Sequence, residues 1–137
     1  LRNLRERTHI IIQLDTVEYL RRGGRVVKLM PVIERLMRTL DLKPLITLVD
    51  GELKLLGVAR SYRKGIARIQ EEIMRLGPLE GLAIMHTRRH EIAERLADEL
   101  AKLTKLARKQ IIVAETGAVL ACHGGDGIIA AVAVTAQ

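Results

Sequence analysis

Residues 44–59, PLITLVDGELKLLGVA, place an Asp-Gly pair between two runs that are rich in aliphatic side chains. Asp-Gly accepts the positive backbone dihedral angles that a two-residue hairpin loop requires, so this pattern is a strong hairpin signal. We therefore expect Pro44–Val49 and Glu52–Ala59 to be antiparallel strands. The predicted hairpin spans Lys43–Arg60 and turns at Asp50-Gly51.

Strand and helix patterns alternate on both sides of this hairpin. The β-branched, apolar run Thr8–Leu14 predicts a buried strand. Stretches with apolar residues at every third or fourth position predict helices, and Ser, Pro or Gly residues mark their ends. Further strands are predicted at Gly81–His86, Gln110–Ala114 and Ile128–Thr135. Helices are predicted at Val17–Arg22, from Pro31 onwards, at Tyr62–Leu76 with Ser61 as its N-cap, and from the N-cap Thr87 to about Leu103. One or two helical turns are predicted at Thr116–Cys122.

This order of elements predicts the fold class. Strands that alternate with amphipathic helices favour an α/β protein with a mixed sheet, here of about six strands. Each helix carries a single apolar stripe, so we expect a two-layer sandwich with the helices mainly on one face of the sheet. The other face is then left for another domain. No internal linker is apparent, and residues 1–137 are expected to form a single domain.

The composition predicts the nature of the core and of the surface. Hydrophobic residues make up 48% of the chain, but Tyr19 and Tyr62 are its only aromatic residues, so the core must be aliphatic. The net charge of +7 comes from residues 1–75, where Lys and Arg outnumber Asp and Glu by 16 to 9. Such a surface attracts nucleic acid, phosphate or carboxylate groups, or is only a solvated Arg-rich surface. Nucleic acid is disfavoured because aromatic stacking platforms, helix-turn-helix motifs and zinc-finger spacings are missing.

Cysteine content and hydropathy indicate the compartment. Cys122 is the only cysteine, which excludes an intramolecular disulfide and fits a reducing cytoplasm. No apolar run approaches the ~20 residues of a membrane-spanning helix, and we recognise no signal peptide. The sequence starts at Leu1 on a charged stretch, from which we expect a piece of a larger protein.

The glycine-rich loop His123–Gly127 is the densest local signal for a ligand. Three glycines in four positions either let a ligand approach the backbone or close a plain tight turn. The order helix, loop, strand argues against a nucleotide cradle, in which the loop precedes a helix. An esterase loop would need a Gly-x-Ser-x-Gly motif, which the sequence lacks. Cys122 and His123 have no third group to orient them for thiol catalysis, and we predict no catalytic residue.

Two other groups of residues have both a functional and a structural interpretation. His86 and His90 are four residues apart, the spacing at which two histidines on one helix can bind a metal ion. However, a strand is expected to end at His86 and a helix to begin near His90, so the two are not on one helix and we predict no metal site. Arg21, Arg22 and Arg25 surround a glycine pair, an arrangement that suits a carboxylate or a phosphate. The same cations also suit a helix C-terminus without any ligand, because they interact favourably with the helix dipole.

Several segments, in order along the chain, resemble the DegV family. Residues 14–26, LDTVEYLRRGGRV, are similar to the family's LDTLEYLRKGGRI signature almost position for position. Residues 42–46, LKPLI, followed by Asp50-Gly51, resemble its IKPIL…DG hairpin. Residues 58–65, VARSYRKG, are similar to its VRTRKKA segment. Residues 117–127, GAVLACHGGDG, resemble the GPVIGAHTGPG segment at the family's C-terminus.

The resemblance implies a lipid carrier and not an enzyme. The resemblance implies a two-domain bacterial protein that holds one long-chain fatty acid between its domains. In the better understood members of the family, the protein presents the carboxylate to a partner fatty-acid kinase. This chain would be the C-terminal domain, without the N-terminal domain, and would supply apolar wall and part of the head-group site. By their positions in the family's motifs, the expected ligand-binding residues are His123, Gly124, Gly125, Arg25 and Arg60.

The chain departs from the family pattern at three positions. The Thr and Pro of the HTGPG motif are Gly124 and Asp126, so a hydroxyl is missing and a carboxylate is added beside the expected head-group site. A fatty-acid carboxylate would be repelled by Asp126 unless a cation lay between them. The Ala of the VRTRKKA segment is Gly65, which we expect to be a minor change inside a helix.

Two functions of different classes follow from the sequence. The first is a cytoplasmic lipid carrier whose partners are a long-chain fatty acid, its own N-terminal domain and a fatty-acid kinase. The alternative is a regulatory or structural dimerisation domain without bound lipid, in which the exposed sheet face pairs with a copy of itself. Neither function needs a cofactor, a metal or a nucleic acid.

Overall fold

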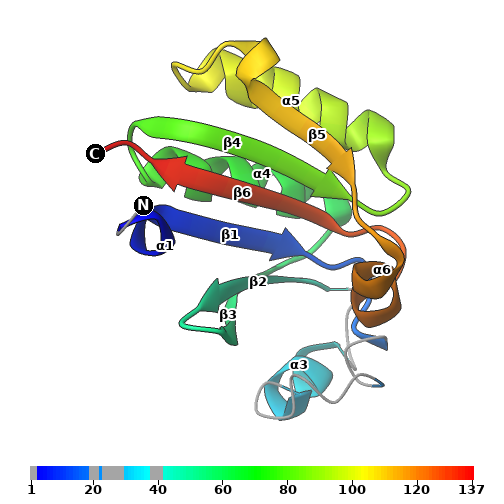
Figure 1. The fold of residues 1–137 in the computed structure, drawn as a ribbon. Helices are drawn as coiled ribbons and strands as arrows, with labels where there is room; N and C mark the ends of the chain where they lie inside the picture. Colours follow the sequence, from blue (N-terminus) through cyan, green and yellow to red (C-terminus); the bar gives the residue numbers. More distant parts are fainter. Residues whose placement is uncertain (1–2, 19–21, 23–29, 38–41) are drawn as a thin grey trace.

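The computed structural model describes residues 3–18, 22, 30–37 and 42–137, which form a six-stranded sheet with helices packed along it (Figure 1). The strands lie in the order β3-β2-β1-β6-β4-β5, so the mixed α/β sheet is as predicted. The strands are β1 (Thr8–Gln13), β2 (Lys43–Val49), β3 (Glu52–Ala59), β4 (Leu79–His86), β5 (Ile111–Glu115) and β6 (Ile129–Thr135). The described helices are α1 (Leu4–Arg7), α3 (Met30–Met37), α4 (Tyr62–Arg75), α5 (His90–Leu103) and α6 (Ala118–Gly124), with a 3-10 turn at Arg108–Gln110.

The hairpin predicted at Asp50-Gly51 is confirmed. β2 and β3 pair antiparallel with Val49 opposite Glu52, so the loop is two residues long. Both loop residues have a positive φ, 52° at Asp50 and 81° at Gly51, as the favoured hairpin turn requires.

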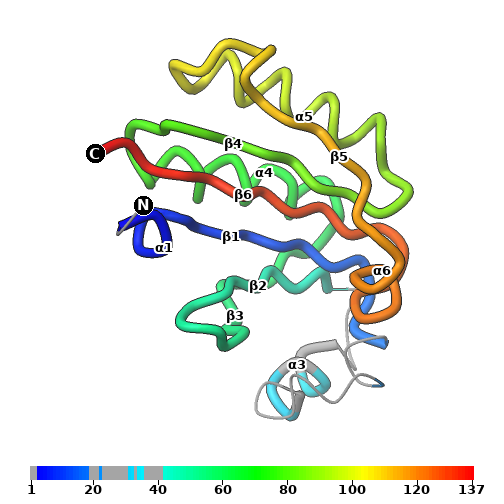
Figure 2. Tube along the Cα trace, in the orientation of Figure 1, coloured from blue at the N-terminus to red at the C-terminus, as the bar shows by residue number. Residues whose placement is uncertain are grey.

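β6 lies in the middle of the sheet although it is the last strand in the sequence. It pairs antiparallel with β1 on one side and with β4 on the other. β4 and β5 are parallel, and the chain between them forms α5 as the crossover. Figure 2 shows β1 and β6 side by side through the centre of the sheet, with α1 close to the end of β6. There Arg7 Nη1 donates a hydrogen bond of 2.8 Å to the Thr135 carbonyl.

One face of the sheet, which we call the covered face, packs against α4 and α5. Both helices run behind the strands in Figure 1. Their apolar stripes join the sheet in one aliphatic cluster, in which Ile73 of α4, Ile84 of β4 and Leu100 of α5 are fully buried. The helices therefore gather on one face, and the core is aliphatic, as the sequence predicts.

The opposite face is also apolar, but no described helix crosses its middle (Figure 1). The strand register aligns its side chains in two rows across the sheet, and we call these ten residues the open face. The first row is Leu55, Ile46, Ile12, Ala130, Met85 and Ala114, and the second is Ile10, Val132, Ala83 and Ile112.

Two local expectations are corrected by the structure. α5 begins at His90 with Arg89 at its N-cap, whereas Thr87 was expected to cap it. Thr87 is buried instead, and its hydroxyl lies 2.7 Å from that of Thr116, so it bonds to the neighbouring strand end. His123 lies in the last turn of α6 and not in the loop, because the helix continues to the next residue.

Gly65 is more than a minor change inside a helix, contrary to expectation. Gln13 of β1 is fully buried beneath α4, and its Nε2 donates a hydrogen bond of 3.1 Å to the Tyr62 carbonyl. A methyl group on Gly65 would overlap the Gln13 side-chain amide. The glycine therefore provides the space that a buried glutamine needs at this point of the core.

Candidate functional site

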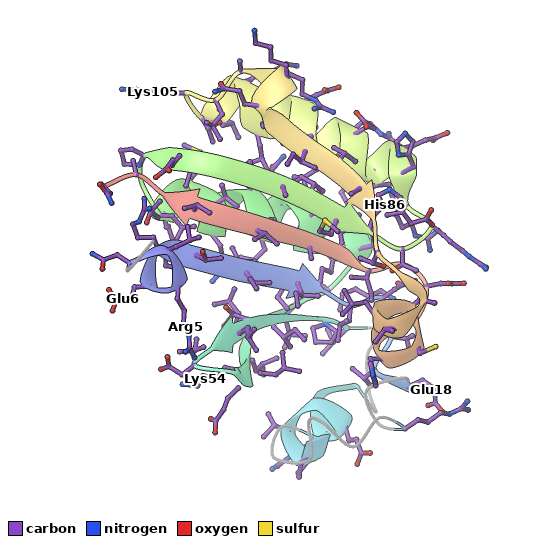
Figure 3. The ribbon with its side chains drawn as sticks, in the orientation of Figure 1. Arg5, Glu6, Glu18, Lys54, His86 and Lys105 are labelled. Carbon is purple, nitrogen blue, oxygen red and sulfur yellow. The ribbon has the colours of Figure 1, made fainter. Side chains whose placement is uncertain are left out.

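All six strands have one end at the same end of the sheet, which we call the loop end. β1, β3, β4 and β5 finish there, whereas β2 and β6 begin there. α4 and α5 also begin there, and α6 lies beside the strand ends (Figure 1). Figure 3 shows His86 at the loop end and Lys105 and Glu6 toward the opposite end. Residues that are far apart in the sequence therefore lie along one edge of the sheet.

The glycines at the end of α6 have structural causes. Gly124 is buried, and a Cβ there would overlap Ile128. Gly125 and Gly127 have φ values of 76° and 85°, a region that favours glycine. A Cβ on Gly127 would also lie 2.8 Å from the Cβ of Asp15. The tight packing of this turn accounts for the glycines without any ligand.

Hydrogen bonds hold the turn at Gly125–Gly127, which we call the glycine turn, against the end of β4 and the start of α4. Gly127 N donates to the Thr87 carbonyl, and Thr87 N donates to the Ile128 carbonyl, both at 3.1 Å. The Tyr62 hydroxyl donates a hydrogen bond of 2.7 Å to the Gly127 carbonyl. Burial raises the pKa of Tyr62 to about 12 against the opposing effect of the Arg89 cation. The hydroxyl therefore stays protonated and remains a donor at neutral pH.

An open pocket of about 440 Å³ lies beside this turn. The Asp15 carboxylate in its wall lies 2.9 Å from Lys43 Nζ and 3.6 Å from Arg89 Nη2. The Arg89 guanidinium also lies 5.8 Å from the centre of the Tyr62 ring, within the range of a cation–π interaction. The other lining residues are Arg60, Ser61 and Ile92.

The structure brings together part of the predicted ligand-binding set. His123 and Gly124 end α6 and Gly125 caps it, so these three residues lie together at the loop end. Arg60 lines the pocket, whereas the half-buried His123 is not among the pocket's lining residues. Arg25 lies outside the described residues, as does the glycine pair before it.

Asp126, the carboxylate that departs from the family motif, has a cationic partner. Its Oδ2 lies 3.4 Å from Arg88 Nη1, and both side chains are exposed. An exposed ion pair of this kind contributes little to stability. It does reduce the negative charge that a ligand carboxylate near His123 would meet.

The environments of His86 and His90 are those of structural residues. His86 is buried, and its Nδ1 accepts a hydrogen bond of 3.2 Å from Arg89 N. His90 Nε2 lies 3.9 Å from a carboxylate oxygen of Glu94. Within the described ranges, no group of three or more His, Cys, Asp or Glu residues could hold a metal ion. Nor is any helix of those ranges long and apolar enough to cross a membrane.

Sequence reasoning did not identify Asp15, Lys43 or Arg89 as site residues. Asp15 follows β1 by two residues, Lys43 begins β2, and Arg89 directly precedes α5. Charged residues at the ends of predicted strands and helices can indicate a binding site. They converge only once the strand order is known, because they come from segments far apart in the chain.

The comparison with known sequences identifies the family. Residues 1–136 match the family described as "Uncharacterised protein, DegV family", so the chain belongs to the DegV family, as the motifs indicated. It is 34% identical over 129 residues to a DegV domain-containing protein of Streptomyces coelicolor, covering 91% of this chain and 44% of that protein. A second such protein, from Halalkalibacterium halodurans, is 26% identical over 132 residues, covering 94% and 45%. The chain spans less than half the length of these relatives.

Solved structures of DegV proteins have the same fold. A DegV family protein from Thermus thermophilus, described as fatty-acid binding, has a TM-score of 0.81 at 25% identity, covering 98% of this chain and 48% of that one. The Streptococcus pneumoniae Fatty Acid Kinase B3 protein loaded with linoleic acid has a TM-score of 0.84 at 18% identity, covering 98% and 47%. The second likeness shows the fold alone.

Proposed function

We propose that the protein binds a long-chain fatty acid and that residues 1–137 form one wall of the binding site. The observation that carries this proposal is the open face, whose middle no described helix crosses. All of its ten residues except Ile46 and Ala130 are at least partly exposed. At Ile46 the open face joins a buried apolar cluster that also contains Leu14 and Ile128. Gly124 packs on that cluster, so the apolar surface runs up to the helix that carries His123. An acyl chain with a polar head needs such a surface.

The second wall is proposed to come from an N-terminal domain, which makes this chain the C-terminal domain of a two-domain protein. The relatives' length, about twice that of this chain, supports the arrangement. Burial of apolar area contributes roughly 25 cal/mol per Å², and one wall removes only part of an acyl chain from water. Residues 1–137 alone should therefore bind fatty acid weakly or not at all.

The carboxylate of the fatty acid is proposed to lie near His123, Gly124 and Gly125, with Arg60 and Arg25 as further cationic groups. An imidazole N–H can donate to a carboxylate or orient a group that does. The role is binding and presentation to a partner kinase, without a covalent step on these residues. α6 offers exposed apolar side chains for such contact. These are Val119 and Leu120, exposed to 73% and 54%.

Native mass spectrometry of the full-length protein, followed by solvent extraction, tests the proposal. One fatty acid per chain is expected, because the two walls together enclose the ligand. Preparations that carry no lipid and do not take up palmitate would contradict fatty-acid binding. Submicromolar binding of palmitate by residues 1–137 alone would contradict the two-wall arrangement.

The open face also supports the second candidate, a dimerisation domain without lipid. A contiguous exposed apolar surface marks either a ligand site or a protein interface. In that case native mass spectrometry shows a lipid-free dimer, and substitution of open-face residues dissociates it. A cytoplasmic location suits both candidates, because it would keep the exposed Cys122 thiol reduced.

A further inference from the structure

Two helices begin close together at the loop end with cations at their N-termini. Arg63 and Lys64 lie in the first turn of α4, which contains no acidic residue. Arg88 and Arg89 directly precede α5, whose first turn contains one acidic residue, Glu91. The N-terminus of a helix carries partial positive charge, so cations there are unfavourable and anions are favourable. The same inversion at two neighbouring helices indicates an anionic ligand.

The pocket beside the glycine turn lies between these two helix starts. Ser61 and Tyr62, at the start of α4, form part of its wall, and Arg89 and Ile92, at the start of α5, form another part. Ile92 also packs against the aliphatic cluster between the sheet and the two helices. The pocket therefore belongs to the covered side of the sheet, whereas the acyl chain is proposed to lie on the open face.

Positive and negative charges do not balance in the pocket wall. Asp15 is the single carboxylate among the lining residues, and Lys43 Nζ lies 2.9 Å from its Oδ1. With this pair set aside, Arg60 and Arg89 leave an excess of two positive charges. Arg89 lies 3.6 Å from the other oxygen of Asp15, and Arg60 has no ion pair within the part of the chain that the structure describes. The pocket is thus positive in front of two positive helix ends.

The start of α4 also offers free backbone donors. Ser61 caps the helix, since its hydroxyl oxygen accepts from Lys64 N at 3.2 Å and its carbonyl accepts from Gly65 N at 3.0 Å. The N–H groups of Tyr62 and Arg63 precede the first intrahelical bond and have no protein partner among the described residues. Backbone N–H groups at a helix start, together with arginine side chains, are the groups that bind phosphate in proteins.

We propose that this pocket binds a phosphate dianion, either free or as the phosphoryl group of a small phosphomonoester. Two negative charges match the two excess cations, whereas a carboxylate matches only one. Several phosphate oxygens also accept hydrogen bonds from the guanidinium and backbone donors at the same time. The site goes beyond the proposed lipid function, because the acyl chain is proposed to lie on the open face and the phosphate on the covered side. Arg60 is the one pocket residue that the two proposals share.

Calorimetric titration of the full-length protein with inorganic phosphate at constant ionic strength tests the proposal. One phosphate should bind per chain, at least about tenfold more tightly than acetate or chloride. Arg89→Gln should weaken phosphate binding about tenfold or more, because it removes a charge-assisted hydrogen bond. Arg75→Gln makes the same charge change in the last turn of α4 and should leave binding within about twofold. Phosphate binding no tighter than acetate, or equal weakening in both variants, overturns the proposal.

A gain of affinity provides the second test. Asp15→Asn removes the pocket carboxylate with little change of shape, so phosphate should bind roughly three- to tenfold more tightly. Unchanged or weaker binding by the folded variant contradicts the proposal. Glycerol phosphate in a parallel titration identifies the source: tighter binding than phosphate indicates an esterified phosphoryl group, and weaker binding indicates free phosphate. Lipid content after solvent extraction should be unchanged in Arg89→Gln, so failure of the phosphate site and failure of lipid binding are separate results.

Discussion

The covered face and the open face of the sheet are both apolar, but they are buried to different extents. On the open face only Ile46 and Ala130 are buried, at 2% and 7% exposure. On the covered face Ile73, Ile84 and Leu100 are fully buried by helices. On the open face Ile112 is 63% exposed, and its neighbours in the second row are only half-buried. Apolar strand residues therefore stabilise the fold on the covered face and are available for binding on the open face. Substitutions on the covered face should therefore reduce stability, whereas substitutions on the open face should leave stability nearly unchanged.

The largest expected effect is on stability, at the covered face. Ile73→Ala should lower the free energy of unfolding by about 2–5 kcal/mol, because it leaves a cavity in a closely packed cluster. Ile112→Ala removes the same groups from the open face and should cost less than about 1 kcal/mol. Urea denaturation of both variants measures the difference. Equal losses would mean that the open face is as much a core as the covered face.

The second effect is on binding, beside the open face. His123→Ala in the full-length protein should weaken fatty-acid binding roughly ten- to a hundredfold, because a hydrogen bond to a charged group is worth about 1.5–3 kcal/mol. The melting temperature should stay unchanged. His90→Ala, an exposed position in α5, is the control and should alter neither quantity. A lower melting temperature with unchanged affinity would show that His123 only closes the turn.

The third effect returns to the covered face, at Gly65. Gly65→Ala should lower the free energy of unfolding by about 1–3 kcal/mol, because the methyl group overlaps the buried Gln13 amide. This loss exceeds the gain in helix propensity, which is at most about 1 kcal/mol. Gly57→Ala is the control, since nothing lies within 4 Å of a Cβ there. A Gly65→Ala protein as stable as the parent would mean that the Gln13 side chain moves aside freely.

The smallest effect concerns Tyr62, which joins the covered face to the glycine turn. Tyr62→Phe should cost about 1 kcal/mol at pH 7, because the Gly127 carbonyl loses its donor. Burial raises the pKa of Tyr62 from 10.0 to about 12, so its contribution is complete below pH 10 and is lost as the pH rises through about 12. The unfolding free energy should therefore fall less steeply between these pH values in Tyr62→Phe. Parallel curves for both proteins would refute a role for this hydroxyl in alkaline unfolding.

Local features of the fold could be predicted from the sequence. The hairpin at Asp50-Gly51 depends on two adjacent residues, and the N-cap at Ser61 depends on its own turn, so both were found. Thr87 was misassigned as a helix cap because its hydroxyl bonds instead to Thr116, 29 residues away. Gly65 of α4 was misjudged for a similar reason, since its partner Gln13 lies far away in the sequence, at the end of β1.

The candidate site could be predicted only in part. The loop after His123 could be recognised because three of its four residues are glycines, and the family motif marked Arg60. The pairing of Asp15 with Lys43 and Arg89 was not visible, because it depends on the order of the strands. Several orders were compatible with the same alternation of strands and helices. Strand order follows from packing between distant segments, which a local pattern does not record.

The central position of β6 has a consequence for how the chain folds. β6 joins β1 to β4, and residues as far apart as Thr8 and Val134 are paired. Until β6 has been synthesised, β1–β3 and β4–β5 are two separate ribbons with unpaired edges. Contacts of such long sequence separation slow folding, and unpaired edges invite association with other chains. We therefore expect this part of the growing chain to be most vulnerable to aggregation just before β6 emerges from the ribosome.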